Sequence, residues 1–258
     1  NARLLTGARH VFAPSHDTAR RIAAFAPAAR VLTVPHTDMA TSDLQPVPVP
    51  QKLQEGRPLK IAVLGALSAI KGADIVEAAA LEAARQQAPL EFHLLGYGYR
   101  HLQTQPRARL TVHGAYKEED LPGLLAWLQP DIVWFPALWP ETYSYTLSAA
   151  LLAGFPIVIP DLGALPERTG HRPWTWVRPW KATAHQWLAF FMELREQHFI
   201  KGVPPPVAPG RVAAGLQEPT SQWSYTKDYL EFLPPPPGGD NNSPVPPPPP
   251  ADWPFTEH

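Results

Sequence analysis

The sequence predicts an α/β fold in which a Rossmann-like parallel sheet carries helices on both faces. Short apolar segments alternate along the chain with segments whose apolar residues recur at helical spacing, and this alternation is typical of a parallel sheet covered by helices. Some short segments, such as residues 59–64, are apolar without interruption, as strands buried on both faces are. A separate, smaller unit precedes them in the sequence.

The first 40 residues predict a small βαβ unit. Its two strands and the helix between them are expected at residues 10–13, 29–34 and 18–25. Ser15 or Asp17 can cap that helix because each places a side-chain oxygen before its first turn. The proline-rich, polar residues 41–58 follow, and we interpret them as a linker.

Residues 59–200 form the main predicted unit. Its strands are expected at residues 59–64, 90–95, 110–113, 131–135, 156–159 and 174–177. Its helices are expected at residues 73–86, 121–128, 145–153 and 182–199. In sheets of this kind, ligands bind at the carboxyl ends of the strands, so the loops there are the places to search for functional residues.

The last part of the chain is rich in proline. Residues 201–233 are interpreted as a crossing segment that ends in a short helix at 222–232, and residues 234–258 as an extended tail or linker. The sequence begins with Asn1 rather than Met, so we interpret it as a piece of a longer polypeptide that can carry further domains.

Composition argues against several classes of function. The net charge of −1 gives no broad attraction to nucleic acid or anionic lipid. Cys is absent, which excludes disulfides and thiolate metal sites. No apolar run reaches the ~20 residues that span a bilayer. We therefore expect a cytoplasmic protein without a transmembrane segment or a nucleic-acid partner; peripheral attachment at the inner membrane is the alternative.

Glu141 is the strongest candidate for chemistry. It lies on the turn before the helix at residues 145–153, beside the positive end of that helix, which suits phosphates and sugar hydroxyls. The simpler interpretation is a capping carboxylate, which stabilises a helix by about 0.5–2 kcal/mol.

Glycines and one lysine follow the first two strands of the main unit. Gly65 lets the backbone turn and approach a ligand, and Lys71 places a cation near the strand ends. The simpler interpretation of Lys71 is a solvated side chain at a helix start. The turn at residues 96–98 is weak evidence by itself, and the histidines show no metal-ligand spacing with carboxylates. The acidic run at residues 118–120 is interpreted as a helix start.

The order of these motifs resembles the donor-binding half of retaining glycosyltransferases with the GT-B fold, of the group 1 or GT4 type. The resemblance extends from about residue 10 to residue 199. The segments that carry it are residues 65–72, 96–98, 113–116, 139–147, 153–159 and 163–167.

The resemblance implies an enzyme that transfers a hexose from a nucleoside diphosphate sugar to a glycan acceptor, in bacterial polysaccharide biosynthesis, without a cofactor or metal. Glu141 would contact the donor sugar, Lys71 would neutralise the diphosphate, and these two residues would be catalytic. The other implied donor-binding residues are Gly65, Ser68, Gly96, Gly98, Gly114, Ser144, Tyr145 and Thr146. Residues 1–40 would be the remnant of the acceptor-side domain.

Two departures from the family pattern support an alternative. Ala66 and Ala149 stand where the family has an arginine and a second glutamate, and losing one charged acceptor costs about 1.5–3 kcal/mol of affinity. The alternative is a degenerate, non-catalytic domain that serves binding or assembly. An epimerase or a phosphorylase ranks last. A glycosidase would use a carboxylate pair such as Asp161 and Glu167, whose separation the sequence does not give.

Overall fold

The computed structural model describes residues 1–34, 46–207, 224, 226 and 227. After α1 (Ala2–Gly7), which the sequence analysis did not predict, the strands β1 (Val11–Ala13) and β2 (Val31–Thr33) pair in parallel around α2 (His16–Phe25). This is the predicted βαβ unit. Ser15 caps α2 by accepting a hydrogen bond from the amide of Thr18 at 3.2 Å.

The main sheet has six strands in the order β5-β4-β3-β6-β7-β8, and every pair is parallel. The strands are β3 (Leu59–Leu67), β4 (Leu90–Gly98), β5 (Leu110–Val112), β6 (Ile132–Trp134), β7 (Ile157–Pro160) and β8 (Thr175–Arg178). The strand order reverses at β3: β4 and β5 are added on one side of it, and β6, β7 and β8 on the other, so that β3 pairs with both β4 and β6. The predicted Rossmann-like fold is therefore confirmed.

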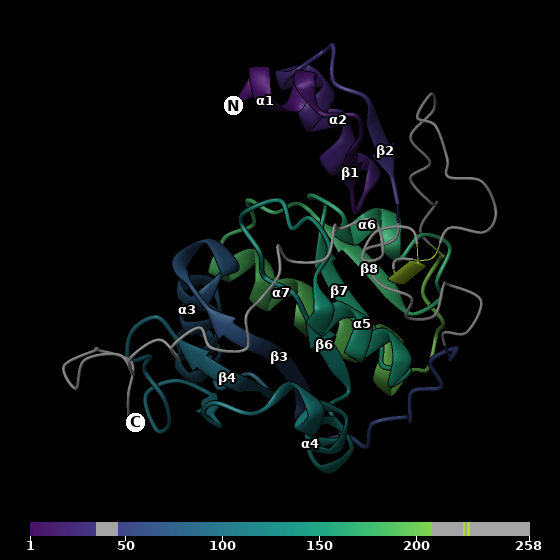
Figure 1. The fold of residues 1–258 in the computed structure, drawn as a ribbon. Coiled ribbons are helices and arrows are strands. Elements are labelled where there is room, and N and C mark those ends of the chain that lie inside the picture. The colour runs from purple at the N-terminus through teal and green to yellow at the C-terminus, as the bar shows by residue number, and fades with distance from the viewer. Residues whose placement is uncertain (35–45, 208–223, 225, 228–258) are drawn as a thin grey trace, which may run out of the picture.

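Helices cover both faces of this sheet (Figure 1). Ile61, Val63 and Trp134 pack into a core with α3 (Ala73–Arg85) and α7 (Ala184–Leu194). Their neighbours Ala62, Leu64 and Val133 face the opposite core, with α4 (Leu121–Leu128), α5 (Tyr145–Leu152) and the short α6 (Leu165–Arg168). Adjacent strand residues point to opposite faces, so an uninterrupted apolar strand fills two cores at once.

Two strands are longer than the sequence predicts. β3 extends to Leu67 and β4 to Gly98, so the expected turns at their ends are paired backbone, with Gly65 opposite Gly96. The close approach explains why both positions are glycine. Gly96 has a φ of 135°, and a Cβ atom there would lie 2.0 Å from the carbonyl oxygen of Gly65.

The long helix expected at residues 182–199 is divided into α7 and the π-helical turn η4 (Arg195–Ile200). The helix expected at residues 222–232 lies outside the described residues apart from positions 224, 226 and 227, and the tail at 234–258 lies outside them entirely. None of the described helices is both long and apolar enough to span a bilayer.

The N-terminal unit contacts the main sheet through α6. The carboxylate of Glu167 accepts hydrogen bonds from the backbone amides of His16, at 3.0 Å, and Asp17, at 3.4 Å. Glu167 therefore serves the first turn of α2, where amides have no acceptor inside the helix. Burial raises the pKa of the Glu167 carboxyl, and the amide hydrogen bonds counter that effect.

Candidate functional site

Two adjoining cavities open at the carboxyl ends of β3, β4 and β6, where the strand order reverses. The larger cavity, of about 590 Å³, lies between the ends of β3 and β4 and the helix α5. The smaller cavity, of about 290 Å³, lies between the loops that follow β3 and β6. Tyr145 and Thr146, at the start of α5, line both. This is the position at which doubly wound sheets bind ligands.

The smaller cavity brings together Lys71 and Glu141, the two residues predicted to be catalytic. Lys71 ends η2 (Ala69–Lys71), and its Nζ lies 4.0 Å from Oε1 of Glu141. The lysine side chain is 53% exposed and the glutamate side chain 26%. An exposed pair of this kind contributes little to stability, so either group can turn to a ligand at small cost.

Backbone contacts fix the loops that carry this pair. The amide of Leu138 donates to the carbonyl of Ile70 at 2.8 Å, which joins the loop after β6 to η2. On the other side, the amide of Ala164 donates to the carbonyl of Glu141 at 2.8 Å. Gly163, with a φ of 65°, lies so close that a Cβ atom there would be 2.6 Å from the same oxygen. The turn at residues 163–167 therefore positions Glu141.

Arg168 organises the turn between Glu141 and α5. Its Nη1 donates to the carbonyl oxygens of Tyr143, at 2.7 Å, and Ser144, at 2.8 Å, and its Nη2 donates to Oγ of Ser148 at 2.7 Å. Its guanidinium carbon also lies 3.9 Å from the centre of the Tyr143 ring. Burial lowers the pKa of Arg168, while the neighbouring Glu167 acts in the opposite direction.

Sequence reasoning missed Arg168. It directly follows the Pro166-Glu167 turn, but its partners are mainly backbone carbonyls, which no residue pattern reveals. It bonds the carbonyl of Ser144, whose backbone φ is 77°, a value that residues other than glycine rarely adopt. Ser144 in turn caps α5 by accepting from the amide of Leu147 at 3.3 Å.

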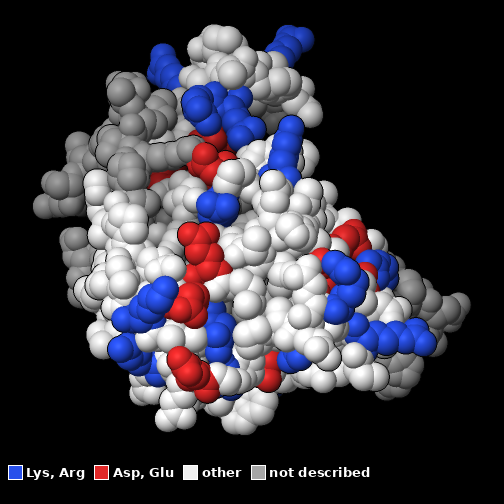
Figure 2. Space-filling model, turned by 180° about the vertical axis from the view of Figure 1, so that it is seen from behind, with Lys and Arg blue, Asp and Glu red and all other residues white. Residues whose placement is uncertain are grey.

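The start of α5 gives the cleft a local positive potential. The first amides of a helix have no acceptor within it and carry part of the helix dipole. Arg168 lies behind this turn and Lys71 beside it. On the face in Figure 2, acidic and basic side chains are interspersed below a group of basic ones at the top. The amides of α5 and Lys71 thus offer an anion a local site in a protein whose net charge is −1.

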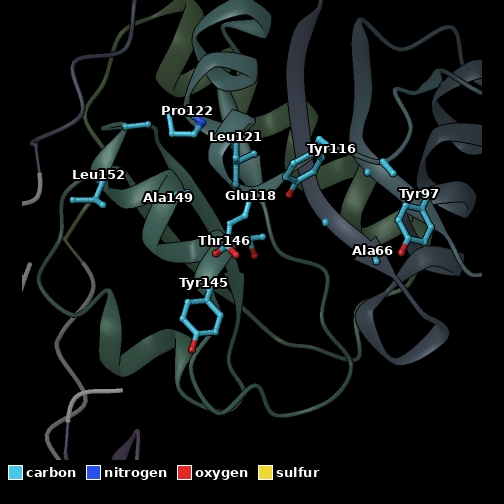
Figure 3. Close-up of a pocket in the computed structure, with 14 residues that line it drawn as sticks. Ala66, Tyr97, Tyr116, Glu118, Leu121, Pro122, Tyr145, Thr146, Ala149 and Leu152 are labelled. Carbon is cyan, nitrogen blue, oxygen red and sulfur yellow. The ribbon is translucent and has the colours of Figure 1, made fainter. Parts of the chain in front are cut away.

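The larger cavity is lined by strand ends, aromatic rings and α5 (Figure 3). Gly65, Ala66 and Gly96 come from the ends of β3 and β4, and Tyr97 and Tyr116 add aromatic surface. Both alanines that depart from the family pattern, Ala66 and Ala149, line this cavity. Its interior is thus mainly apolar, in contrast to the smaller cavity.

Most of the predicted donor-binding residues lie in one of the cavities. Those that line them are Gly65, Lys71, Gly96, Glu141, Ser144, Tyr145 and Thr146. Ser68, Gly98 and Gly114 lie behind the lining. Ser68 accepts from the amide of Lys71 at 3.3 Å, and the amide of Gly114 donates to the carbonyl of Gly96 at 3.0 Å. A Cβ atom on Gly98 would lie 2.9 Å from the carbonyl oxygen of Arg100.

The remaining polar candidates do not form a second site. Glu167, half of the carboxylate pair considered for a glycosidase, is bonded to the amides of α2. His93 and His113 stack at the β4–β5 edge, with Nδ1 and Nε2 3.1 Å apart. Burial lowers the pKa of both. Within residues 1–34 and 46–207, no group of three or more His, Asp or Glu side chains could hold a metal ion.

No family model matches this chain, and comparison with curated proteins gives no match either. Solved structures do match. HepE of Anabaena, in complex with UDP and glucose, is 17% identical over 76% of this chain and 57% of its own, with a TM-score of 0.53. The lipopolysaccharide outer core galactosyltransferase WaaB is 15% identical over 74% of this chain and 54% of its own, with a TM-score of 0.53.

A third similar structure is the pneumococcal O-GlcNAc transferase GtfA in complex with UDP and GlcNAc, 15% identical over 75% of this chain and 39% of its own, with a TM-score of 0.50. These similarities show the fold: the parallel sheet with helices on both faces matches the GT-B architecture of such proteins. The chain spans about half the length of HepE and WaaB, and less of GtfA.

Proposed function

We propose that this chain is the donor-binding part of a glycosyltransferase that uses a nucleoside diphosphate sugar. The observation that carries the proposal is the meeting of Lys71 and Glu141, 4.0 Å apart, beside the start of α5. A cation and helix amides suit a diphosphate, and a carboxylate beside them suits sugar hydroxyls. The neighbours HepE and GtfA, whose structures contain UDP with glucose or GlcNAc, are consistent with such a ligand.

In the proposed reaction, the bond between the sugar C1 and the diphosphate oxygen breaks and a bond between C1 and an acceptor hydroxyl oxygen forms. The hydroxyl proton leaves with the diphosphate. Lys71 and the first amides of α5 stabilise the negative charge that develops on the departing group, and this electrostatic effect is a large part of many enzymatic rate enhancements. Glu141 orients the sugar through its hydroxyls.

The finer assignment rests on the resemblance of the motifs. On that basis we propose a GT4-type enzyme that transfers a hexose with retention to a glycan acceptor, in bacterial polysaccharide synthesis in the cytoplasm or at the inner membrane. The acceptor would bind in the cleft between this part and an N-terminal domain, of which residues 1–34 supply one βαβ unit.

A second candidate is a non-catalytic relative of these enzymes. It is favoured by one observation: both Ala66 and Ala149 line the larger cavity, and the methyl side chain of neither can form a hydrogen bond with a ligand. A domain of this kind would keep the fold but bind nucleotide weakly or not at all, and would serve an interaction or an assembly.

Calorimetric titration with UDP, GDP and ADP distinguishes the two candidates. We expect one of them to bind and Lys71→Ala to weaken binding about tenfold or more, because a charge-assisted contact contributes about 1.5–3 kcal/mol. Lys117→Ala is the matched control, since the Lys117 side chain is 80% exposed and pairs with Glu119 at 3.9 Å. Absence of binding at millimolar nucleotide would reject the donor site and favour the non-catalytic candidate.

A further inference from the structure

Glu118 is the one acidic or basic side chain among the described residues that line the larger cavity. Glu118 begins η3 (Glu118–Asp120), immediately before α4, so it comes from a different element of the lining than α5. In Figure 3 its side chain extends into the cavity toward the helix that carries Thr146 and Ala149. The sequence analysis treated it only as part of an acidic helix start.

Two neighbouring glutamates of η3 differ in their surroundings. Both are exposed, but only Glu118 lines the cavity; Glu119 is 77% exposed and pairs with Lys117. The Glu118 carboxylate forms no hydrogen bond or ion pair with any side chain that the structure describes. An ionised carboxylate can only accept hydrogen bonds, so its partners in this cavity are water or the donor groups of a ligand.

The continuity of the two cavities indicates which part of a ligand reaches Glu118. Tyr145 and Thr146 line both, so a diphosphate at the start of α5 would continue directly into the larger cavity. The group bonded to the α-phosphate of a nucleoside diphosphate is the ribose. Its 2′ and 3′ hydroxyls are adjacent donors that match the two oxygens of one carboxylate.

The residues of α5 that line the cavity offer no carboxylate. Ala149 lies three residues after Thr146, on the same side of α5, and its methyl group cannot accept a hydrogen bond. The remaining lining close to α5 is supplied by apolar residues such as Leu121 and Leu152. A ribose in this cavity therefore has one carboxylate within the lining to bind its diol.

We propose that Glu118 holds the ribose hydroxyls of the nucleotide and makes the site selective for ribonucleotides over 2′-deoxyribonucleotides. The proposal rests on the proposed function, because it requires a nucleoside diphosphate in the cleft. The ribose contact is thus supplied from η3 instead of α5, and the alanine at position 149 is compatible with nucleotide binding.

The test compares each of UDP, GDP and ADP with its 2′-deoxy analogue by calorimetry, using the chain and three variants. We expect the wild-type chain to bind the preferred ribonucleotide about tenfold or more tightly than its deoxy analogue, the range for hydrogen bonds to a charged group. Glu118→Ala should reduce this ratio to about one, and Glu118→Gln should give an intermediate ratio. Glu119→Ala, the matched control, should leave it unchanged.

The ratio separates the two proposals. If the wild-type chain binds none of the nucleotides, the proposed function is wrong and the role of Glu118 falls with it. If the chain binds a ribonucleotide and Glu118→Ala keeps the wild-type ratio, the donor site stands and the assignment of Glu118 is overturned. A ratio that changes equally in Glu119→Ala also overturns it, because a general effect of charge would then be the cause.

Discussion

The two cavities share the start of α5 but are built by different means. The smaller one is polar, and its Lys71–Glu141 pair lies on loops tied together by backbone hydrogen bonds. The larger one is mainly apolar, with glycine strand ends on one side and the lone carboxylate of Glu118 on another. The difference teaches that a polar cleft can be held by backbone hydrogen bonds between loops, whereas the character of the apolar cavity depends on the side chains that line it.

The largest effect is expected at Arg168, the half-buried cation beside the smaller cavity. Arg168→Met removes the guanidinium that donates to the carbonyls of both Tyr143 and Ser144, so we expect the unfolding free energy to fall by about 1–3 kcal/mol. Nucleotide affinity should fall as well, because Ser144 would no longer be held in its capping conformation. Denaturant unfolding and calorimetry measure the two effects.

Arg172→Met is the matched control for that change. Arg172 is buried, and like Arg168 it donates to a backbone carbonyl, that of Phe155 at 2.9 Å, beside the amino end of β7. Its loss should lower stability and leave nucleotide affinity unchanged. Equal losses of affinity in both variants would mean that Arg168 acts only through global stability.

A smaller effect is expected at Glu141, and it should differ between the nucleoside diphosphate hexose and the free nucleoside diphosphate. Glu141→Gln keeps the shape of the side chain but removes its charge, so the sugar hydroxyls lose a charged acceptor. We expect the affinity for the nucleoside diphosphate hexose to fall about tenfold, and that for the free diphosphate to stay the same or rise. Equal changes for the two ligands would place the sugar elsewhere.

The smallest expected effect is a pH dependence of stability, and it arises from two histidines at the β4–β5 edge of the sheet. Burial lowers the pKa of His93 and His113 in the folded chain, although Glu91, 3.8 Å from His93, partly opposes this. The unfolded chain then takes up protons first, near pH 6.5. Stability should be complete above that pH and fall as the pH is lowered through and below it.

Denaturant unfolding between pH 5 and pH 8 measures this dependence. In His113→Asn the decline should be smaller, because one of the two imidazoles with a lowered pKa is gone. His101→Gln is the control, since His101 is exposed. A decline that is the same in all three chains would assign the pH dependence to other groups.

The fold was predictable from the sequence because buried segments differ from exposed ones in the spacing of their apolar residues. Uninterrupted apolar segments such as residues 59–64 gave the strands, and helical spacing gave most of the helices. The strand ends were predicted too short, because glycines that permit close approach of two strands look the same as glycines of a turn. Gly65 and Gly96 are the clearest case.

The candidate site was predictable only in part. Lys71 and Glu141 could be identified because each follows a strand and precedes a helix, and parallel strands bring such positions to one edge. Arg168 and Glu118 could not. The first acts on backbone carbonyls and the second faces a cavity formed by a distant helix, so both roles depend on tertiary packing that a local pattern does not contain.

The most direct test of the central claim is a crystal structure of this chain with its preferred nucleoside diphosphate. We expect the diphosphate to lie between Lys71 and the first turn of α5, and the ribose hydroxyls to lie within hydrogen-bond distance of Glu118. A nucleotide bound away from α5 would contradict the proposed donor site. A nucleotide at α5 with its ribose turned away from Glu118 would contradict the proposed binding of the ribose in the larger cavity.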